Sequence, residues 1–283
     1  MERRHFLRLP LVAATTGAAL SSGAAIAQAT AIPGTVNASS HIPALKGFGH
    51  AGKDALALQQ IKNLKLKWHY SWSAQANTMT PAFTPMIRNA SVIDRDAFGV
   101  ISRQLAQTKA KHLLGFNEPD VTSATNMSVD QAISLWPQLQ ATGLRLGSPA
   151  TVSPSSPWLA DFMKKAKNKG LRVDFITMHI YGWPNSRDFL NKLAKLYDTY
   201  KKPIWVTEYA VADWGATAAR PCKYSRAETE VFMRETVAGM RAMPYIERFA
   251  WKTRKAGDVK MPCSTIFNAN GTLTSTGKLY ASL

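Results

Sequence analysis

Two glutamates that each close an apolar stretch are the residues of this sequence best suited to chemistry. Glu118 follows residues 113–116 in an Asn-Glu-Pro turn, and Glu208 ends the stretch 203–208. Desolvating a carboxylate is costly unless it faces a polar site. Two facing carboxylates can cleave a glycosidic bond, because one protonates the leaving oxygen and the other attacks the anomeric carbon. These roles need different environments, since one group must be protonated and the other ionised. The alternative is that either glutamate merely pairs with a cation.

Polar and aromatic residues accompany the glutamates. Asn117 directly precedes Glu118 and could hydrogen-bond the sugar hydroxyl next to the reacting carbon. Sugars stack their C–H faces on aromatic rings, and aromatic residues recur at the ends of predicted strands: Trp72, Tyr181, Trp183, Tyr209 and Trp251. A single such residue more often belongs to a core. Their recurrence at one end of several strands indicates a sugar-binding surface.

Other motifs do not support a cofactor or a metal. Residues 47–52 match G-x-G-x-x-G, but no acidic residue lies between Asp54 and Asp94 to bind a ribose. The six histidines are dispersed, and two cysteines cannot supply a metal site built from cysteine pairs. We therefore expect no metal and no cofactor.

The elements that must position these residues alternate in type. Eight β-branched or aromatic runs are separated by helix-like segments, some of which begin with capping boxes at 128–131 and 225–228. The runs are Leu45–Gly49, Lys67–Trp72, Phe83–Arg88, His112–Asn117, Leu144–Pro149, Asp174–Tyr181, Pro203–Glu208 and Ile246–Trp251. The second and third runs lie too close together for a good intervening helix. This pattern predicts an α/β fold, a single (β/α)₈ TIM barrel, with an open doubly wound sheet as the rival. Glu118 and Glu208 then close strands four and seven, on the face that carries the active site.

The N-terminus predicts export. Residues 1–29 combine Arg3, Arg4 and Arg8, a mild apolar stretch and an Ala-Gln-Ala end, which is typical of a twin-arginine signal peptide. An ordinary secretory signal with incidental arginines is the alternative. Residues 30–283 are then the catalytic domain, in the periplasm or outside the cell.

The chain is strongly basic, with a formal net charge of +17 over 283 residues. Removing residues 1–29 lowers this charge by only two, so it belongs to the folded protein. No nucleic-acid motif and no membrane-length apolar run is present. We therefore expect a solvated basic surface, no nucleic-acid partner, no stable membrane insertion and a monomer. We also expect a disulfide between Cys222 and Cys263, in neighbouring loops after strands seven and eight.

Several motifs resemble glycoside hydrolase family 128. They are the segments 115–120, 146–150 with Trp158-Leu159, 178–182, 205–210 and 249–251, and the resemblance covers roughly residues 45–281. It implies an endo-β-1,3-glucanase with a clan A barrel that acts on β-1,3-glucan, with Glu118 as acid/base and Glu208 as nucleophile. The residues expected to bind this substrate are Asn117, Trp72, His179, Tyr181 and Trp251.

The sequence departs from that family at two strand ends. The second strand commonly ends in Tyr-Asn-Trp and here reads Tyr70-Ser71-Trp72, and the third commonly ends in an aromatic where this chain has Arg88. Both positions lie near the expected glycone subsites. Two alternatives therefore stay open: a clan A glycosidase acting on another polysaccharide, which includes acidic ones, and a β-glucan-binding protein without catalysis.

Overall fold

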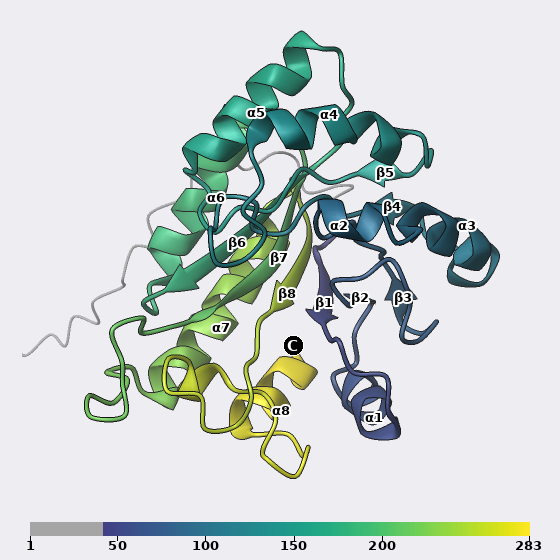
Figure 1. Ribbon diagram of the computed structural model, residues 1–283. Helices are drawn as coiled ribbons and strands as arrows, with labels where there is room; N and C mark the ends of the chain where they lie inside the picture. Colours follow the sequence, from purple (N-terminus) through teal and green to yellow (C-terminus); the bar gives the residue numbers. More distant parts are fainter. Residues whose placement is uncertain (1–41) are drawn as a thin grey trace, which may run out of the picture. The chain divides into compact units, whose positions relative to one another are not determined.

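The computed structural model describes residues 42–283, whose elements are arranged as in Figure 1. The expected signal peptide, residues 1–29, lies outside the described residues. Across residues 42–283, every helix is too short or too polar to cross a bilayer.

Eight parallel strands form the centre of the fold, one within or overlapping each predicted run. They are β1 (Leu45–Gly49), β2 (Trp68–Tyr70), β3 (Ala82–Phe83), β4 (His112–Leu113), β5 (Arg145–Leu146), β6 (Ile176–Gly182), β7 (Ile204–Val211) and β8 (Ile246–Trp251). Six of them form one sheet in the order β3-β2-β1-β8-β7-β6, and β4 pairs with β5. Because all pairings are parallel, the strands of each sheet end at a common edge.

Single parallel bridges connect the two sheets. The bridge between Met86 and Leu114 joins the segments that follow β3 and β4. Two further bridges, Gly147 with Phe175 and Thr151 with Met178, join the β5 segment to β6. The β4–β5 pair is thus linked to both ends of the six-stranded sheet.

Eight α-helices and one short 3₁₀ helix lie between or after the strands of the described chain. They are α1 (Ala55–Asn63), α2 (Ala90–Ile93), α3 (Ala97–Thr108), α4 (Val129–Gln140), α5 (Pro157–Asn168), α6 (Ser186–Tyr200), α7 (Arg226–Ala242), η1 (Pro262–Ser264) and α8 (Ser275–Ser282). Ser225 and Glu228 form the predicted capping box at the start of α7. As the sequence predicted, no helix separates β2 from β3.

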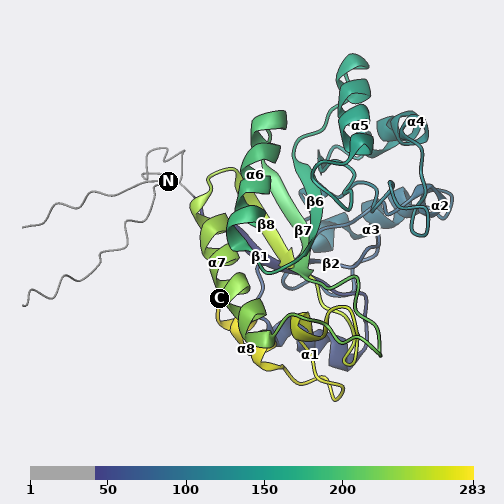
Figure 2. The same cartoon turned by 90° about the vertical axis from the view of Figure 1, so that its left-hand side faces the viewer.

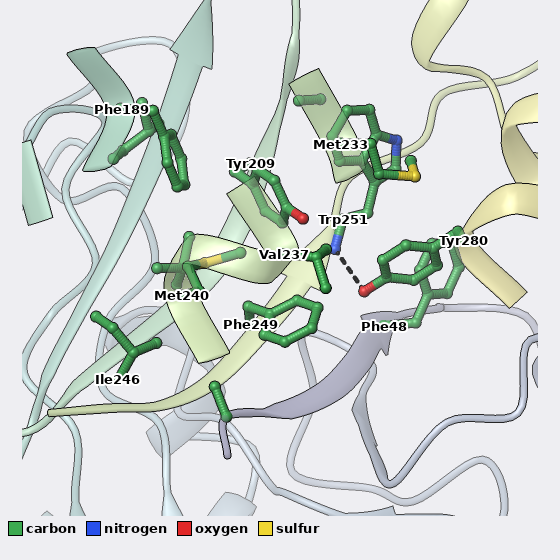
Figure 3. Packing of buried hydrophobic residues seen from close by; sticks show 14 of the residues in the cluster. Phe48, Phe189, Tyr209, Met233, Val237, Met240, Ile246, Phe249, Trp251 and Tyr280 are labelled. Carbon is green, nitrogen blue, oxygen red and sulfur yellow. Dashed lines mark hydrogen bonds between the residues drawn. The ribbon is translucent and has the colours of Figure 1, made fainter. Parts of the chain in front are cut away.

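The largest core cluster lies between the strands β6–β8 and the helices α6 and α7, which run side by side in Figure 2. The last helix is fixed to this cluster by Tyr280, which is fully buried. The Tyr280 hydroxyl donates to Gly47 O at 2.7 Å and accepts from Trp251 N at 3.1 Å, as Figure 3 shows for the second bond. Tyr280 therefore links the C-terminal helix to both β1 and β8.

Side chains from strands that are not neighbours in the sheet also meet. Near the strand beginnings, Arg145 of β5 binds both carboxylate oxygens of Glu247 of β8, at 2.6 and 2.8 Å. Trp205 of β7 donates its indole N–H to the same carboxylate at 2.7 Å. A second cluster packs Trp68 of β2 against Trp205, with ring centroids 5.3 Å apart. These contacts connect β5 with β8 and β2 with β7 through their side chains.

The expected disulfide is not formed. Cys222 and Cys263 are both free thiols, although their sulfur atoms lie near one carbonyl oxygen, that of Tyr224, at 3.9 and 3.2 Å. Burial raises the pKa of the Cys263 thiol, which keeps it protonated. The expectation that the two loops are neighbours therefore holds, but each sulfur donates its proton to a carbonyl instead of bonding to the other sulfur.

Candidate active site

The turn after β4 holds Glu118 between two neighbouring segments. Asn117 N donates to Arg88 O at 2.9 Å, and Glu118 N donates to Ala150 O at 2.7 Å. Glu118 has a φ of 45°, in the left-handed region that side chains with a Cβ rarely adopt. Such backbone conformations cost about 1–3 kcal/mol and concentrate at functional sites. The turn thus fixes the carboxyl group of Glu118 at the end of its strand.

Glu208 lies within the longest strand, β7, opposite His179 of β6. The two residues are register partners, just after an irregularity between Met178 and His179. Glu208 is 4% exposed and His179 is fully buried. Because adjacent parallel strands place register partners side by side, both side chains leave the sheet on the same face.

His179 lies between the two glutamates. Its Nδ1 is 2.8 Å from Glu118 Oε1, and its Nε2 is 3.6 Å from Glu208 Oε1. One oxygen of each carboxylate and one histidine nitrogen all lie within 4.8 Å of one another. The first contact has hydrogen-bond length, whereas the second is within ion-pair range only. The sequence-predicted carboxylates are therefore brought together across one histidine.

Four donors surround the carboxylate of Glu208. Oε1 accepts from the indole N–H of Trp72 at 2.7 Å and from the Tyr70 hydroxyl at 3.3 Å. Oε2 accepts from the Tyr181 hydroxyl and pairs with Lys252 Nζ at 3.0 Å. Each of the two carboxylate oxygens therefore has two of these groups within reach.

These contacts decide the protonation state of Glu208. Burial alone would raise its pKa, but the charges of His179 and Lys252 and the hydrogen bonds from Tyr181 and Trp72 outweigh burial and lower the pKa to about 2. Glu118 has a different environment: its side chain is 23% exposed, against 5% for Glu208. The site therefore holds one buried, ionised carboxylate next to one that solvent can reach.

Glu118, His179 and Glu208 are spaced closely enough to hold a metal ion. Two observations disfavour a cation there. The Lys252 ammonium lies 3.0 Å from Glu208 and would repel it, and Glu208 already accepts from Trp72 and Tyr181. The donor set suits a carboxylate held as an anion better than a metal ligand.

Four of the five predicted substrate-binding residues lie at or next to the two glutamates. Trp72, His179 and Tyr181 contact the glutamates directly. Asn117 lies beside Glu118, and its Oδ1 is buried without a hydrogen-bond partner in the described structure. That unpaired acceptor could take a sugar hydroxyl.

Trp251 does not line the site, and its assignment to substrate binding is wrong. Its side chain is 1% exposed, packs edge-on against Tyr209 and donates its indole N–H to Ser264 O at 2.9 Å. A buried ring whose N–H already has a partner offers no face to a sugar. Figure 3 shows Trp251 among the core residues.

Two site residues were not found by sequence reasoning: Tyr70 and Lys252. Tyr70 is fully buried, and its single hydroxyl proton is shared between Thr207 O at 2.9 Å and Glu208 Oε1 at 3.3 Å. Lys252 directly follows β8 and lies 3.9 Å from the centre of the Trp72 ring. A lysine directly after the last strand was the available signal, but the chain has 35 lysines and arginines.

Two hollows flank Trp72 at the ends of the strands. One, of about 350 Å³, lies against the segments that follow β2 and β3 and includes Arg88 and Arg95. The other, of about 600 Å³, lies against the ends of β1 and β8 and includes Lys252 and Arg254. Both hollows thus share one lining residue, Trp72, which also contacts Glu208.

Comparisons with known proteins identify the family of this chain. The family model described as glycosyl hydrolase catalytic core matches residues 47–280. A subgroup I endo-β-1,3-glucanase of family GH128 from Amycolatopsis mediterranei, solved with laminaripentaose, is 31% identical, covers 84% of this chain and 99% of its own, and has a TM-score of 0.73. The chain therefore belongs to the glycosyl hydrolases, within glycoside hydrolase family 128.

Two further matches are less similar in sequence. A subgroup III curdlan-specific exo-β-1,3-glucanase from Blastomyces gilchristii is 23% identical, covers 84% of this chain and 98% of its own, and has a TM-score of 0.66, a likeness that shows the fold alone. Alkali-sensitive linkage protein 1 of Schizosaccharomyces pombe is 27% identical over 243 residues, which is 82% of this chain. The match spans 43% of the length of that relative.

Proposed function

We propose that this protein is a retaining endo-β-1,3-glucanase in which Glu208 is the nucleophile and Glu118 the acid/base. The observation that carries the proposal is the pair itself: two carboxylates with oxygens within 4.8 Å, one buried and ionised, the other reachable by solvent. Retaining pairs are spaced by about 5–5.5 Å, whereas inverting pairs leave room for a water between them. The substrate is inferred from the Amycolatopsis relative, which was solved with a β-1,3-glucan oligosaccharide.

The first step transfers the sugar to the enzyme. Glu118 donates its proton to the glycosidic oxygen while a carboxylate oxygen of Glu208 bonds to the anomeric carbon, and the C–O bond to the leaving sugar breaks. A pKa of about 2 keeps Glu208 ionised at neutral pH, as a nucleophile requires. His179 holds Oε1 of Glu118, which leaves Oε2 to carry the proton toward the substrate.

The second step releases the sugar. Glu118, now ionised, takes a proton from water, whose oxygen bonds to the anomeric carbon as the ester bond to Glu208 breaks. Negative charge returns to Glu208 in this step. Lys252, Tyr181 and Trp72 are already in place to stabilise that charge, so little reorganisation is needed.

We infer further that the strands form a closed (β/α)₈ barrel. The bridges from β3 to β4 and from β5 to β6 support closure, since they connect both ends of the six-stranded sheet through β4 and β5. The ion pair between Arg145 of β5 and Glu247 of β8 supports it as well, because two strands lie between them in the order of the sheet. An open doubly wound sheet would keep those side chains apart.

A reducing-sugar assay on laminarin, curdlan, mannan and an acidic glycan tests the function. We expect release from laminarin, with mixed oligosaccharides appearing early as endo action requires, and no release by Glu118→Gln or Glu208→Gln. Glucose or one short product alone would indicate exo action. Activity only on another polysaccharide would favour a different clan A glycosidase, and binding without hydrolysis would favour a glucan-binding protein.

We also propose that the protein is exported by its N-terminal twin-arginine segment. The support is the sequence of residues 1–29. Replacing Arg3 and Arg4 by lysine should leave uncleaved protein in the cytoplasm, while normal export of that variant would contradict the proposal.

A further inference from the structure

The smaller hollow beside Trp72 is lined by two arginines and by no acidic residue. Its walls come from Ser71–Gln75 after β2, Arg88 after β3, residues of α2 and α3, and Arg95 in the turn between these two helices. Ser71 and Ser73 contribute hydroxyl groups, and Trp72 is the only ring in the lining. A hollow of about 350 Å³ can take one sugar unit with a substituent.

This hollow is connected to the two glutamates through residues that line it. The main chain of Arg88 accepts the N–H of Asn117, the residue before Glu118, at 2.9 Å. Trp72, which forms its wall, donates to Glu208 at 2.7 Å. Two lining residues of this hollow, Arg88 and Trp72, are therefore hydrogen-bonded to Asn117 and to Glu208.

Neither arginine has a side-chain partner among the described residues. The acidic residues nearest to Arg95 in sequence are Asp94 and Asp96, and Asp96 is paired with Arg103 at 2.9 Å. Arg88 and Arg95 are both exposed and take part in no ion pair or side-chain hydrogen bond of residues 42–283. Two unpaired guanidinium groups at one hollow repel each other unless an anion lies between them.

The larger hollow on the other side of Trp72 has the same sign of charge. Lys252, Arg254 and Lys255 line it, again without a carboxylate in the lining. Of these three, Lys252 is paired with Glu208 and Arg254 with Asp258 at 3.5 Å. Positive groups therefore border the path of a substrate on both sides of Trp72, in a chain whose net charge is +17.

We propose that the physiological substrate is a β-1,3-glucan that carries anionic groups, and that Arg88 and Arg95 form the subsite for one such group. The inference rests on the proposed function and names the class of glucan that the site selects. Guanidinium groups bind carboxylate, phosphate and sulfate oxygens through paired N–H donors, and the serine hydroxyls add further donors. A neutral glucan offers hydroxyl oxygens as acceptors but cannot form an ion pair with these groups.

The test compares laminarin with laminarin that has been carboxymethylated or sulfated to a low degree. At about 20 mM salt, kcat/KM of the unaltered protein should be about fivefold higher on an anionic polymer than on the neutral one, since a partly exposed ion pair contributes up to about that factor. The ratio should approach one at about 500 mM salt, where charges are screened. The carboxymethyl and sulfate arms show which anion the subsite takes.

The double variant Arg88→Ala with Arg95→Ala should lower that ratio to within about twofold of one at low salt. Arg234→Ala is the matched control, because Arg234 is an exposed arginine within α7, and it should keep the ratio of the unaltered protein. Equal thermal unfolding of the three proteins shows that folding is not the cause.

A ratio at or below one for the unaltered protein, or an unchanged ratio in the double variant, would overturn the anion subsite while leaving the glucanase intact. Failure to hydrolyse any of the polymers would instead contradict the proposed function, so the two failures are distinguishable.

Discussion

Replacing Lys252 by methionine should shift the acidic limb of the pH–rate profile upward. Lys252 Nζ lies 3.0 Å from Glu208 Oε2, and its positive charge is one of the causes that lower the pKa of Glu208 to about 2. Methionine keeps an apolar chain over the Trp72 ring, where the ammonium lies 3.9 Å from the centroid. The substitution therefore removes the charge and keeps most of the packing.

The size of the shift follows from the geometry. An opposite charge at this range lowers a carboxyl pKa by about 1–3 units, and the 24% exposure of the Lys252 side chain favours the lower half of that range. A shift of about 1.5 units would place the pKa of Glu208 near 3.5. At pH 3 the ionised fraction would fall from about 0.9 to about 0.25, so kcat/KM should fall about fourfold, with almost no change from this cause at pH 6.

The assay is kcat/KM on an aryl β-laminaribioside between pH 2.5 and 7, with circular dichroism at each pH to confirm that the protein is folded. Lys278→Met is the control, because Lys278 is an exposed lysine on α8, and its acidic limb should match that of the unaltered protein. An acidic limb of Lys252→Met that stays within about 0.3 units of the control would refute the reasoning.

Three further outcomes are expected. Azide should restore activity to Glu208→Gly and give a glycosyl azide of inverted configuration. With Glu118→Ala and an activated aryl glycoside, azide should give a glycosyl azide of retained configuration. The reverse pattern of products, read by NMR, would exchange the two roles. Because the folded-state pKa of Glu208 is depressed, its stabilising contribution is present above about pH 4.5 and is lost as the pH falls toward 2, up to about 3 kcal/mol. Urea unfolding at pH 6 and pH 3 should therefore show a smaller loss for Glu208→Gln than for the unaltered protein, and an equal loss would count against the depressed pKa. Glu247→Ala leaves Arg145 and the indole N–H of Trp205 unpaired, so the free energy of unfolding should fall by about 1–3 kcal/mol without a change in KM; no change in a urea melt would contradict this role.

The strands were predictable because each is a short apolar run between polar segments. β1 and β8 match the predicted bounds, and the strand residues of β4 and β5 lie inside longer predicted runs. The same logic placed Glu118 and Glu208 at one edge, since parallel strands all end there. The sequence could not show that Glu208 is the ionised carboxylate of the pair. That state depends on donors from three other strand ends, namely Tyr181, Trp72 and Lys252.

Among the aromatic residues at strand ends that were predicted to bind substrate, some lie beside the glutamates and others lie in the core. An aromatic residue at the end of a strand can face the site or the core, and both give the same sequence pattern. Trp72 and Trp251 both end β-runs, yet Trp72 reaches Glu208 and Trp251 is buried beside α7. Alternation along a strand sends side chains to opposite faces, and the sequence does not say which face is which. Trp72 also has a φ of 52°, a left-handed backbone conformation that no residue pattern in the sequence predicts.

Trapping the glycosyl-enzyme tests the central claim most directly. A 2-deoxy-2-fluoro β-laminaribioside with an activated leaving group slows the second step more than the first, so the covalent intermediate should accumulate. Peptide mass spectrometry should then find one fluorinated disaccharide on Glu208, and none on the Glu208→Gln variant. An adduct on Glu118 or on any other residue, or turnover with inversion and no adduct at all, would contradict the assignment of Glu208 as the nucleophile of a retaining enzyme.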